Sequence, residues 1–288
     1  MVFHYTSARS SFSKAIRLKN PPMLPRSSLG TLPGRAESIF RPASRQVMRR
    51  LSTMEKLKMA ALIRKRNDPS PRTPHFTRNS NFADCVKLDL DEDGHRTWGY
   101  VMYRCTYKSD SDWNEFMRRL RIHTEKTMEF YKGLDMMDCL ALTVFDDQTT
   151  FDGATTSFVR EHFKKWAATA PQEEQGTGPG NAQRYRYCIQ VTDESLDSII
   201  RKAPPPDEHT INKDGFVNII DASWEPYSQW DGDERFEDDE EPLEGCTLLD
   251  VGWMRVCYDG VMTGSYYYLR NSSAWDHEYR RPSEIVQQ

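Results

Sequence analysis

The side chains best suited to catalysis are a carboxylate and an imidazole that lie close together in the sequence, Asp152 and His162. A carboxylate can orient an imidazole that acts as a general acid or base, and Arg160 between them could hold an anion. We therefore take Asp152 and His162 as catalytic candidates. The competing interpretation is structural: Asp152 caps a turn, His162 is half-buried in a helix, and Arg160 is solvated.

Arg104 is a second binding candidate beside Arg160, because it stands among apolar residues in a stretch that reads as a central strand. A charge in such surroundings requires a partner. Asp147 and Asp221, which are expected at strand ends, could supply one. A structural ion pair and a pocket on the sheet are both compatible with this pattern.

The sequence shows no pattern for a metal or a cofactor, and we expect neither. There is no C-x-x-C or H-E-x-x-H, and no His pairs with a Cys or another His at ligand spacing. Gly176, Gly178 and Gly180 lead into a predicted strand, so they offer no helix N-terminus to a phosphate. The acidic run 231–241 begins like a calcium loop, but Arg235 stands where an oxygen ligand belongs.

The charge of the chain changes sign near Phe82. Residues 1–82 hold 17 Lys or Arg and 3 acids, whereas the remaining residues hold 22 basic and 40 acidic side chains. All seven Trp lie in the acidic part. The first segment is therefore interpreted as a targeting signal or a tail, and the second as the folded domain.

We divide the chain into a mitochondrial transit peptide at 1–50, a basic linker at 51–82 and a single α+β domain at 83–288. The first twenty residues carry Arg9, Lys14, Arg17 and Lys19 without an acid, which is typical of import signals. Three other interpretations stay open: a nuclear signal at 64–66, a basic arm that contacts nucleic acid or membrane, and a true start at Met54. Mitochondrial localisation is predicted, with the cytoplasm or nucleus as alternatives.

The folded part reads as five strands and several helices. Residues 98, 100 and 102 of the first strand alternate with apolar residues 101, 103 and 105, so both of its faces are predicted to be buried. Helices are expected at 111–133, 155–166 and 193–200, the last ended by the prolines at 204–206. The strands are predicted at 97–107, 140–145, 185–192, 215–221 and 251–258.

This order predicts a ferredoxin-like split βαβ sandwich of the α+β class, with a mid-chain helical insertion and an extra C-terminal strand. Many functions use that plan, RNA binding among them. The third strand lacks the aromatic signature of RNA-binding modules and the domain is acidic, so nucleic acid is disfavoured as a partner. The six dispersed cysteines indicate reduced core residues, and no apolar run is long enough for a membrane span.

Several short motifs, in order, resemble a pattern in uncharacterised proteins of filamentous fungi. They are WGYVMYR at 98–104, SDSDW at 109–113, FDG at 151–153, RYRY at 184–187 and GWM at 252–254. The resemblance implies an intracellular fungal protein and brings no activity with it.

The sequence favours an intracellular domain that binds a protein or a small molecule and has no recognisable catalytic motif. The alternative is an enzyme that modifies a small molecule in a pocket on the sheet formed by Arg104, Asp152 and His162. A third hypothesis is an RNA-binding protein that uses the basic N-terminal arm.

Overall fold

The structure, a computed structural model, describes residues 52–208, 211–226, 240–271 and 273–287. These belong to one compact unit, Ser52–Gln288. The predicted transit peptide at 1–50 and most of the acidic run at 231–241 lie outside the described residues.

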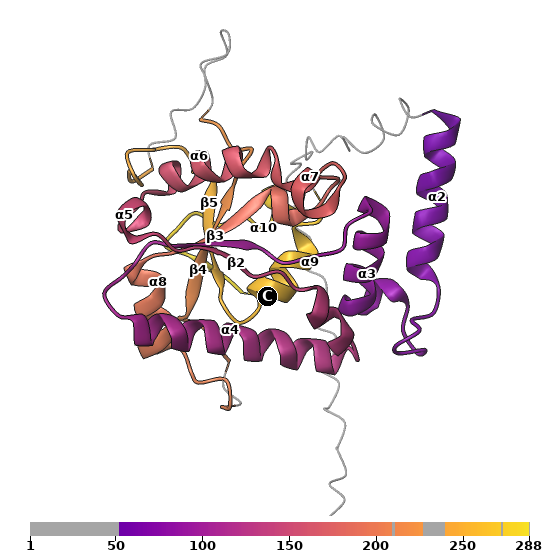
Figure 1. Ribbon diagram of the computed structural model, residues 1–288, viewed down its shortest axis with the longest axis horizontal. Helices are drawn as coiled ribbons and strands as arrows, with labels where there is room; N and C mark the ends of the chain where they lie inside the picture. The colour runs from indigo at the N-terminus through magenta and orange to yellow at the C-terminus, as the bar shows by residue number, and fades with distance from the viewer. Residues whose placement is uncertain (1–51, 209–210, 227–239, 272, 288) are drawn as a thin grey trace, which may run out of the picture. The chain divides into compact units, whose positions relative to one another are not determined.

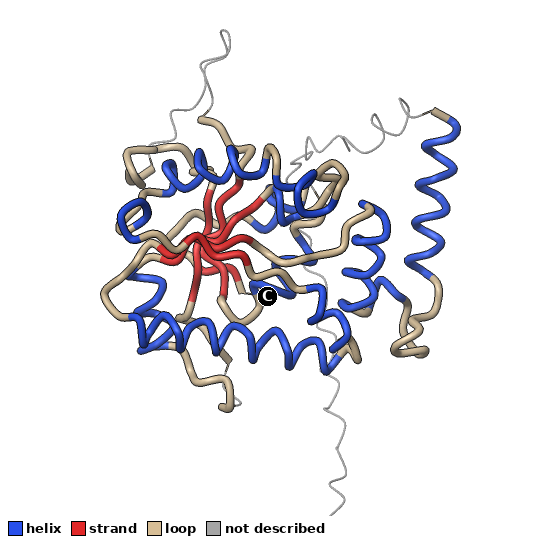
Figure 2. The backbone as a smooth tube through the Cα atoms, viewed as in Figure 1, coloured by secondary structure: helices blue, strands red, loops and turns tan. Residues whose placement is uncertain are grey.

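A six-stranded mixed sheet forms the centre of the unit, with helices on both of its faces (Figure 2). The strand order is β2-β1-β3-β4-β5-β6, and only β4 runs against the others. The strands are β1 Val101–Arg104, β2 Thr143–Phe145, β3 Tyr187–Val191, β4 Phe216–Asp221, β5 Trp253–Cys257 and β6 Ile285–Val286.

The helices differ widely in length, and short helical turns connect several of them (Figure 1). The α-helices are α2 Thr53–Asn67, α3 Phe82–Asp93, α4 Asp110–Phe130, α5 Gln148–Phe151, α6 Thr156–Ala167, α7 Ala170–Gln175, α8 Asp193–Asp197, α9 Tyr266–Tyr268 and α10 Ala274–Glu278. The shorter turns are η1 Arg78–Ser80, η2 Leu134–Cys139, η3 Gln183–Tyr185, η4 Ser198–Lys202 and η5 Val261–Ser265.

The two long crossover helices cover opposite faces of the sheet (Figure 1). Helix α4 begins at the cap Ser109, whose hydroxyl accepts a hydrogen bond from the Asp112 amide, and it packs Phe116 and Leu120 on one face. Helix α6 packs Val159 and Phe163 on the other face. The two apolar faces predicted for the first strand are thereby confirmed, because its alternate residues belong to two separate clusters.

The mixed α and β character is confirmed, but the ferredoxin-like arrangement is not. In that plan the helices are segregated to one side of an antiparallel sheet. Here β1 pairs in parallel with both β2 and β3. Strand β1 therefore lies between β2 and β3. The connection from β1 to β2 runs in one direction along the sheet, and the connection from β2 to β3 runs in the other direction, past β1. Crossovers of the same hand that run in opposite directions place their helices on opposite faces.

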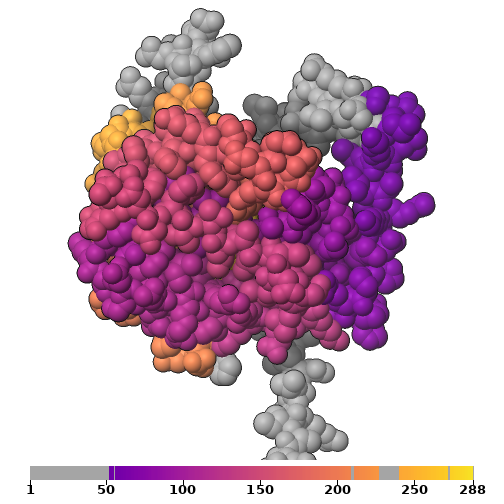
Figure 3. All heavy atoms as spheres, in the orientation of Figure 1, coloured from indigo at the N-terminus to yellow at the C-terminus, as the bar shows by residue number. Residues whose placement is uncertain are grey.

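The segment 51–82, expected as a linker, contains helix α2 and contacts the domain. Arg66 of α2 donates to Asp89 at 2.6 Å and to Glu92 at 3.1 Å, both on α3. Ser70 donates to the buried carboxylate of Asp84 at 2.5 Å. Figure 3 shows α2 in indigo at the edge of the unit. Ion pairs and a buried hydrogen bond thus join this segment to α3.

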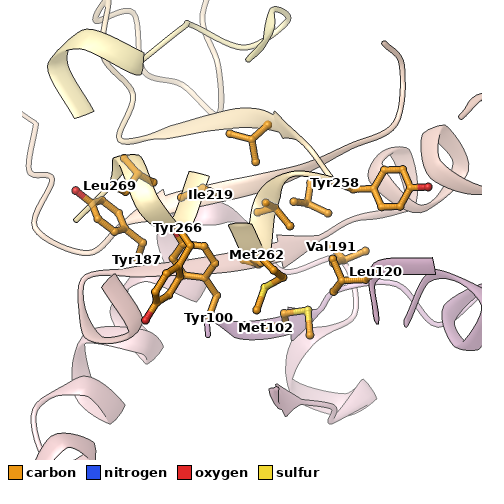
Figure 4. Packing of buried hydrophobic residues seen from close by; sticks show 14 of the residues in the cluster. Tyr100, Met102, Leu120, Tyr187, Val191, Ile219, Tyr258, Met262, Tyr266 and Leu269 are labelled. Atoms are coloured by element: carbon orange, nitrogen blue, oxygen red, sulfur yellow. The ribbon is translucent and has the colours of Figure 1, made fainter. Parts of the chain in front are cut away.

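Tyr100, directly before β1, is buried completely in the cluster beneath α4, against Tyr266 (Figure 4). Its hydroxyl has no hydrogen bond within the described residues, and burial raises its pKa well above the usual value. We expect Tyr100→Phe to raise the free energy of unfolding by about 1 kcal/mol, because it removes an unsatisfied buried polar group. Denaturant titration measures the change.

Tyr103 provides the matched control for this prediction. It lies in β1 and is also fully buried, but its hydroxyl shares a hydrogen bond of 2.9 Å with Nδ1 of His162. Tyr103→Phe should therefore lower the free energy of unfolding by about 1 kcal/mol. Losses of equal size in both variants would show that the Tyr100 hydroxyl is satisfied in solution.

Candidate functional site

A groove of about 460 Å³ lies where η1, α4 and the segment after β5 meet. We call it the Tyr267 groove. Its polar groups come from η1, from α4 and from the turn that follows β5, and its aromatic rings come from α3, the end of α4 and α9. It is lined by Asn79, Ser80, Phe82, His123, Thr127, Tyr131, Asp259, Gly260, Thr263, Gly264, Tyr267 and Tyr268.

His123 stands in the middle of α4 and meets Tyr258 directly after β5. Nε2 of His123 and the Tyr258 hydroxyl share a hydrogen bond of 3.2 Å, with the rings edge to face at 5.3 Å. Figure 4 shows this hydroxyl directed away from the other labelled core residues. Burial lowers the pKa of His123 and raises that of Tyr258 to about 12. Both groups are therefore uncharged at neutral pH and act through hydrogen bonding.

Asp259 supplies the carboxylate of the groove. Asn212, which is buried, donates from its amide nitrogen to Oδ1 of Asp259 at 3.2 Å and to the carbonyl of Gly215 at 2.9 Å. The carboxylate is thus held by a side chain that is itself fixed to the backbone. Among the described lining residues there is no Lys or Arg.

Tyr267 and Tyr268 form an aromatic wall of the groove. Tyr266 before them lies in the core instead, because successive helical residues point in different directions. Tyr266 is buried against Trp98 and Tyr100, whereas Tyr268 is 48% exposed. The rings of Tyr267 and Tyr268 lie 5.4 Å apart. The Tyr267 hydroxyl donates to the backbone carbonyl of Asn79 at 3.4 Å, which links this wall to the segment before α3.

The π-helical turn η5 lies between the carboxylate and the aromatic wall. Single π-helical turns recur at functional sites, where they redirect side chains that a regular helix would place elsewhere. Thr263 and Gly264 of this turn line the groove. One wall of the groove is thus formed by this turn, which follows β5 in the chain.

Arg104 lies at the carboxyl end of β1, where it is buried and fully paired. Its guanidinium contacts Asp110 and Asp146 and donates to the Thr106 carbonyl at 3.0 Å. The rings of Tyr107 and Trp113 lie 4.5 and 5.1 Å from it. The expected need for a carboxylate is met, but the partners are Asp110 and Asp146, not the predicted Asp147 or Asp221.

Arg160 is buried and is bonded to backbone carbonyls. It donates to the carbonyls of Asp221 at 3.0 Å, Val251 at 3.2 Å and Gly252 at 3.0 Å. The ring of Trp224 lies 4.7 Å from the guanidinium, and burial lowers the pKa of Arg160. Arg160 therefore joins α6 to the end of β4 and to the residues just before β5. The interpretation of the sequence in which Arg160 is solvated is wrong.

His162 lies on the other side of α6, among the rings of Phe145 and Phe151. Asp152 ends α5 and is exposed. Within the described residues, no hydrogen bond or ion pair joins any two of Asp152, Arg160, His162 and Arg104. The structure brings His162 to Tyr103, and Asp152 has no hydrogen bond to this pair.

The environment of His162 predicts a dependence of stability on pH. Burial, and then the nearby charge of Lys165, lower its pKa below the ordinary 6.5. Between the two values the unfolded chain binds more protons than the folded one, so the free energy of unfolding falls as the pH drops below 6.5. Above pH 6.5 this penalty is absent.

We expect His162→Gln to make that decline shallower by up to about 1.4 kcal/mol per pH unit, the limit for one proton. Denaturant titrations from neutral to mildly acid pH measure the slope in both proteins. The chemically similar His277→Gln, at an exposed residue, should leave the slope unchanged. Identical slopes for wild type and His162→Gln would contradict the prediction.

Sequence reasoning missed the groove because its residues come from three separated segments with no common motif. The one local signal was the run of three tyrosines at 266–268. Within the described residues, no group of three or more His, Cys, Asp or Glu is placed to hold a metal ion. In the same part of the chain, no helix is long and apolar enough to cross a membrane.

Comparisons with models of protein families, with curated proteins and with solved structures found no match. A function is therefore inferred from the geometry of the Tyr267 groove and from the chemistry of the side chains that line it.

Proposed function

We propose that this domain binds a small organic molecule in the Tyr267 groove. The observation that carries the proposal is the groove itself, which combines about 460 Å³ of space with four aromatic rings and a few oriented polar groups. Ligand sites in proteins have this composition, in which apolar walls supply contact area and few polar groups set orientation. The His123–Tyr258 hydrogen bond and the anchored Asp259 are the oriented groups here.

The proposal is tested by ligand-observed NMR of the full chain against a set of small organic fragments. Tyr268→Ala removes one of the two rings of the aromatic wall. Phe158→Ala is the matched control, because Phe158 is 47% exposed, nearly as much as Tyr268, and does not line the groove. We expect Tyr268→Ala to weaken binding roughly fivefold, as for the loss of about 1 kcal/mol of aromatic contact.

Phe158→Ala should leave the fragment affinities unchanged. Fragments that bind equally well to both variants would place the ligand elsewhere. A chain that binds no fragment at all would remove the support for a ligand-binding domain.

The mitochondrial localisation, the resemblance to fungal proteins and the enzyme alternative stay predictions. The enzyme alternative requires Arg104, Asp152 and His162 to act in one pocket. Arg104 is paired with two carboxylates at the end of β1, whereas His162 contacts Tyr103 beneath α6. The binding proposal needs no such rearrangement, because its residues already line one groove.

A further inference from the structure

We propose that the ligand of the Tyr267 groove is an organic cation, a protonated amine carried on an apolar body. This inference rests on the proposed function, since it names the chemical class of the molecule that the groove takes. Three independent properties of the lining favour that class: its charge, its aromatic surface and the state of its histidine.

The charge of the lining is negative. Asp259 is a carboxylate within it, and the described lining residues include no Lys or Arg to oppose it. Asn212 donates to Oδ1 of Asp259, which fixes the carboxylate without neutralising it. A protonated amine supplies the missing positive charge, and hydrogen bonds to a charged group are stronger than those between neutral groups.

The aromatic surface suits the same ligand. Phe82, Tyr131, Tyr267 and Tyr268 line the groove, and the faces of such rings attract cations while their area covers an apolar body. The Tyr267–Tyr268 wall is half open to solvent, with the two rings inclined at 68°. Ammonium groups are recognised in proteins by clusters of aromatic rings.

The histidine of the groove does not repel a cation. His123 is kept neutral by burial, and its ring already meets the Tyr258 hydroxyl through Nε2. The charge of Asp259 raises the pKa of His123 and so opposes the effect of burial. The charges of Lys126 and Arg119, which are not lining residues, lower that pKa as burial does. A neutral imidazole offers hydrogen bonding without adding positive charge to the groove.

An anionic ligand lacks a counter-ion in the same groove. A phosphate or carboxylate would face Asp259, and the described lining holds no guanidinium or ammonium group to receive it. Like charges in a partly desolvated site disfavour binding. The groove therefore discriminates by charge in the order cation, neutral molecule, anion.

Three molecules of nearly equal shape test that order: benzylamine, benzyl alcohol and benzoate. Their affinities for the full chain are measured by NMR titration in wild type, in Asp259→Asn and in Asp276→Asn. Asp276 is an exposed acid on α10 that does not line the groove, so it controls for the loss of one negative charge. Tyr268→Ala reports whether each molecule binds in the groove.

We expect benzylamine to bind about tenfold more tightly than benzyl alcohol, with benzoate weakest, in wild type and in Asp276→Asn. In Asp259→Asn the amine and the alcohol should bind equally. Binding of the alcohol that is sensitive to Tyr268→Ala, with no preference for the amine, would overturn the cation inference and leave the ligand-binding proposal intact. If none of the three shows binding sensitive to Tyr268→Ala at millimolar concentration, both proposals fail.

Discussion

Replacing Arg184 by Met is expected to lower the free energy of unfolding by about 3–5 kcal/mol, as for other buried ion pairs that lose one partner. Arg184 is 1% exposed, and its guanidinium donates to both carboxylate oxygens of Glu174 at 2.7 and 2.8 Å. It also donates to the carbonyls of Gly99 at 3.1 Å and Ala141 at 2.9 Å. One side chain thus joins α7 to the starts of two strands.

The loss follows from what remains after the substitution. Glu174 would keep its charge with only the Tyr185 hydroxyl donating to it, at 2.9 Å, and the carbonyls of Gly99 and Ala141 would lose the guanidinium donor. Burial works against the charged form of Arg184, but Glu174 outweighs it, so the pKa of Arg184 is raised. Methionine fills part of the space and donates nothing.

Arg121→Met is the matched control for Arg184→Met. Arg121 forms an ion pair with Glu125 one helical turn away, and its side chain is 65% exposed. Its removal should change the free energy of unfolding by about 0.5 kcal/mol or less. Chemical denaturation of the three proteins measures both effects, and similar losses in the two variants would refute the role assigned to Arg184.

The second large effect is expected for Gly252→Ala, at about 3–5 kcal/mol of lost stability, since it combines backbone strain with overpacking. Gly252 has a φ of +74°, a conformation in which a Cβ atom is strained. A Cβ there would also lie 2.3 Å from a ring carbon of Trp224 and 2.7 Å from Nη2 of Arg160. The ring and the guanidinium would both have to move.

Gly153→Ala separates the two contributions. Gly153 has a similar φ of +65°, but apart from its two chain neighbours no described residue has an atom within 4 Å of the position of its Cβ. Its substitution should cost only the backbone term of about 1–2 kcal/mol. The difference between the two variants in denaturant titrations measures the crowding at Trp224 and Arg160, and equal losses would show that this contact relaxes freely.

Four of the motifs quoted from the sequence contain residues that form these contacts or serve as their controls. Gly252 begins GWM and Arg184 begins RYRY. Gly99 of WGYVMYR accepts from Arg184, and the amide of Gly153 in FDG donates to the Cys105 carbonyl at 3.1 Å. Each of these motifs therefore contains a glycine or an arginine that holds the backbone or a buried side chain in place.

Local patterns in the sequence predicted five of the six strands and the two long helices that cover the sheet. Alternation of apolar residues indicated β1 as a strand buried on both faces, and the prolines after Ala203 marked the end of η4. Strand β6 and the helices α2, α3, α5, α7 and α10 were missed. The segment of α3 was assigned partly to a linker, and β6 has only two residues, too few to show a period.

The sequence by itself determined strands β1 to β5, helices α4 and α6, and which of their faces are apolar, because those properties depend on neighbours a few residues apart. The tertiary structure alone decided the order of the strands, since spacing does not say in which direction a crossover runs along a sheet. It also decided that Arg104 pairs with Asp110 and Asp146, and that His123, Asp259 and Tyr267 line one groove. Such contacts join residues far apart in the chain, and they exist only after the core has brought the segments together.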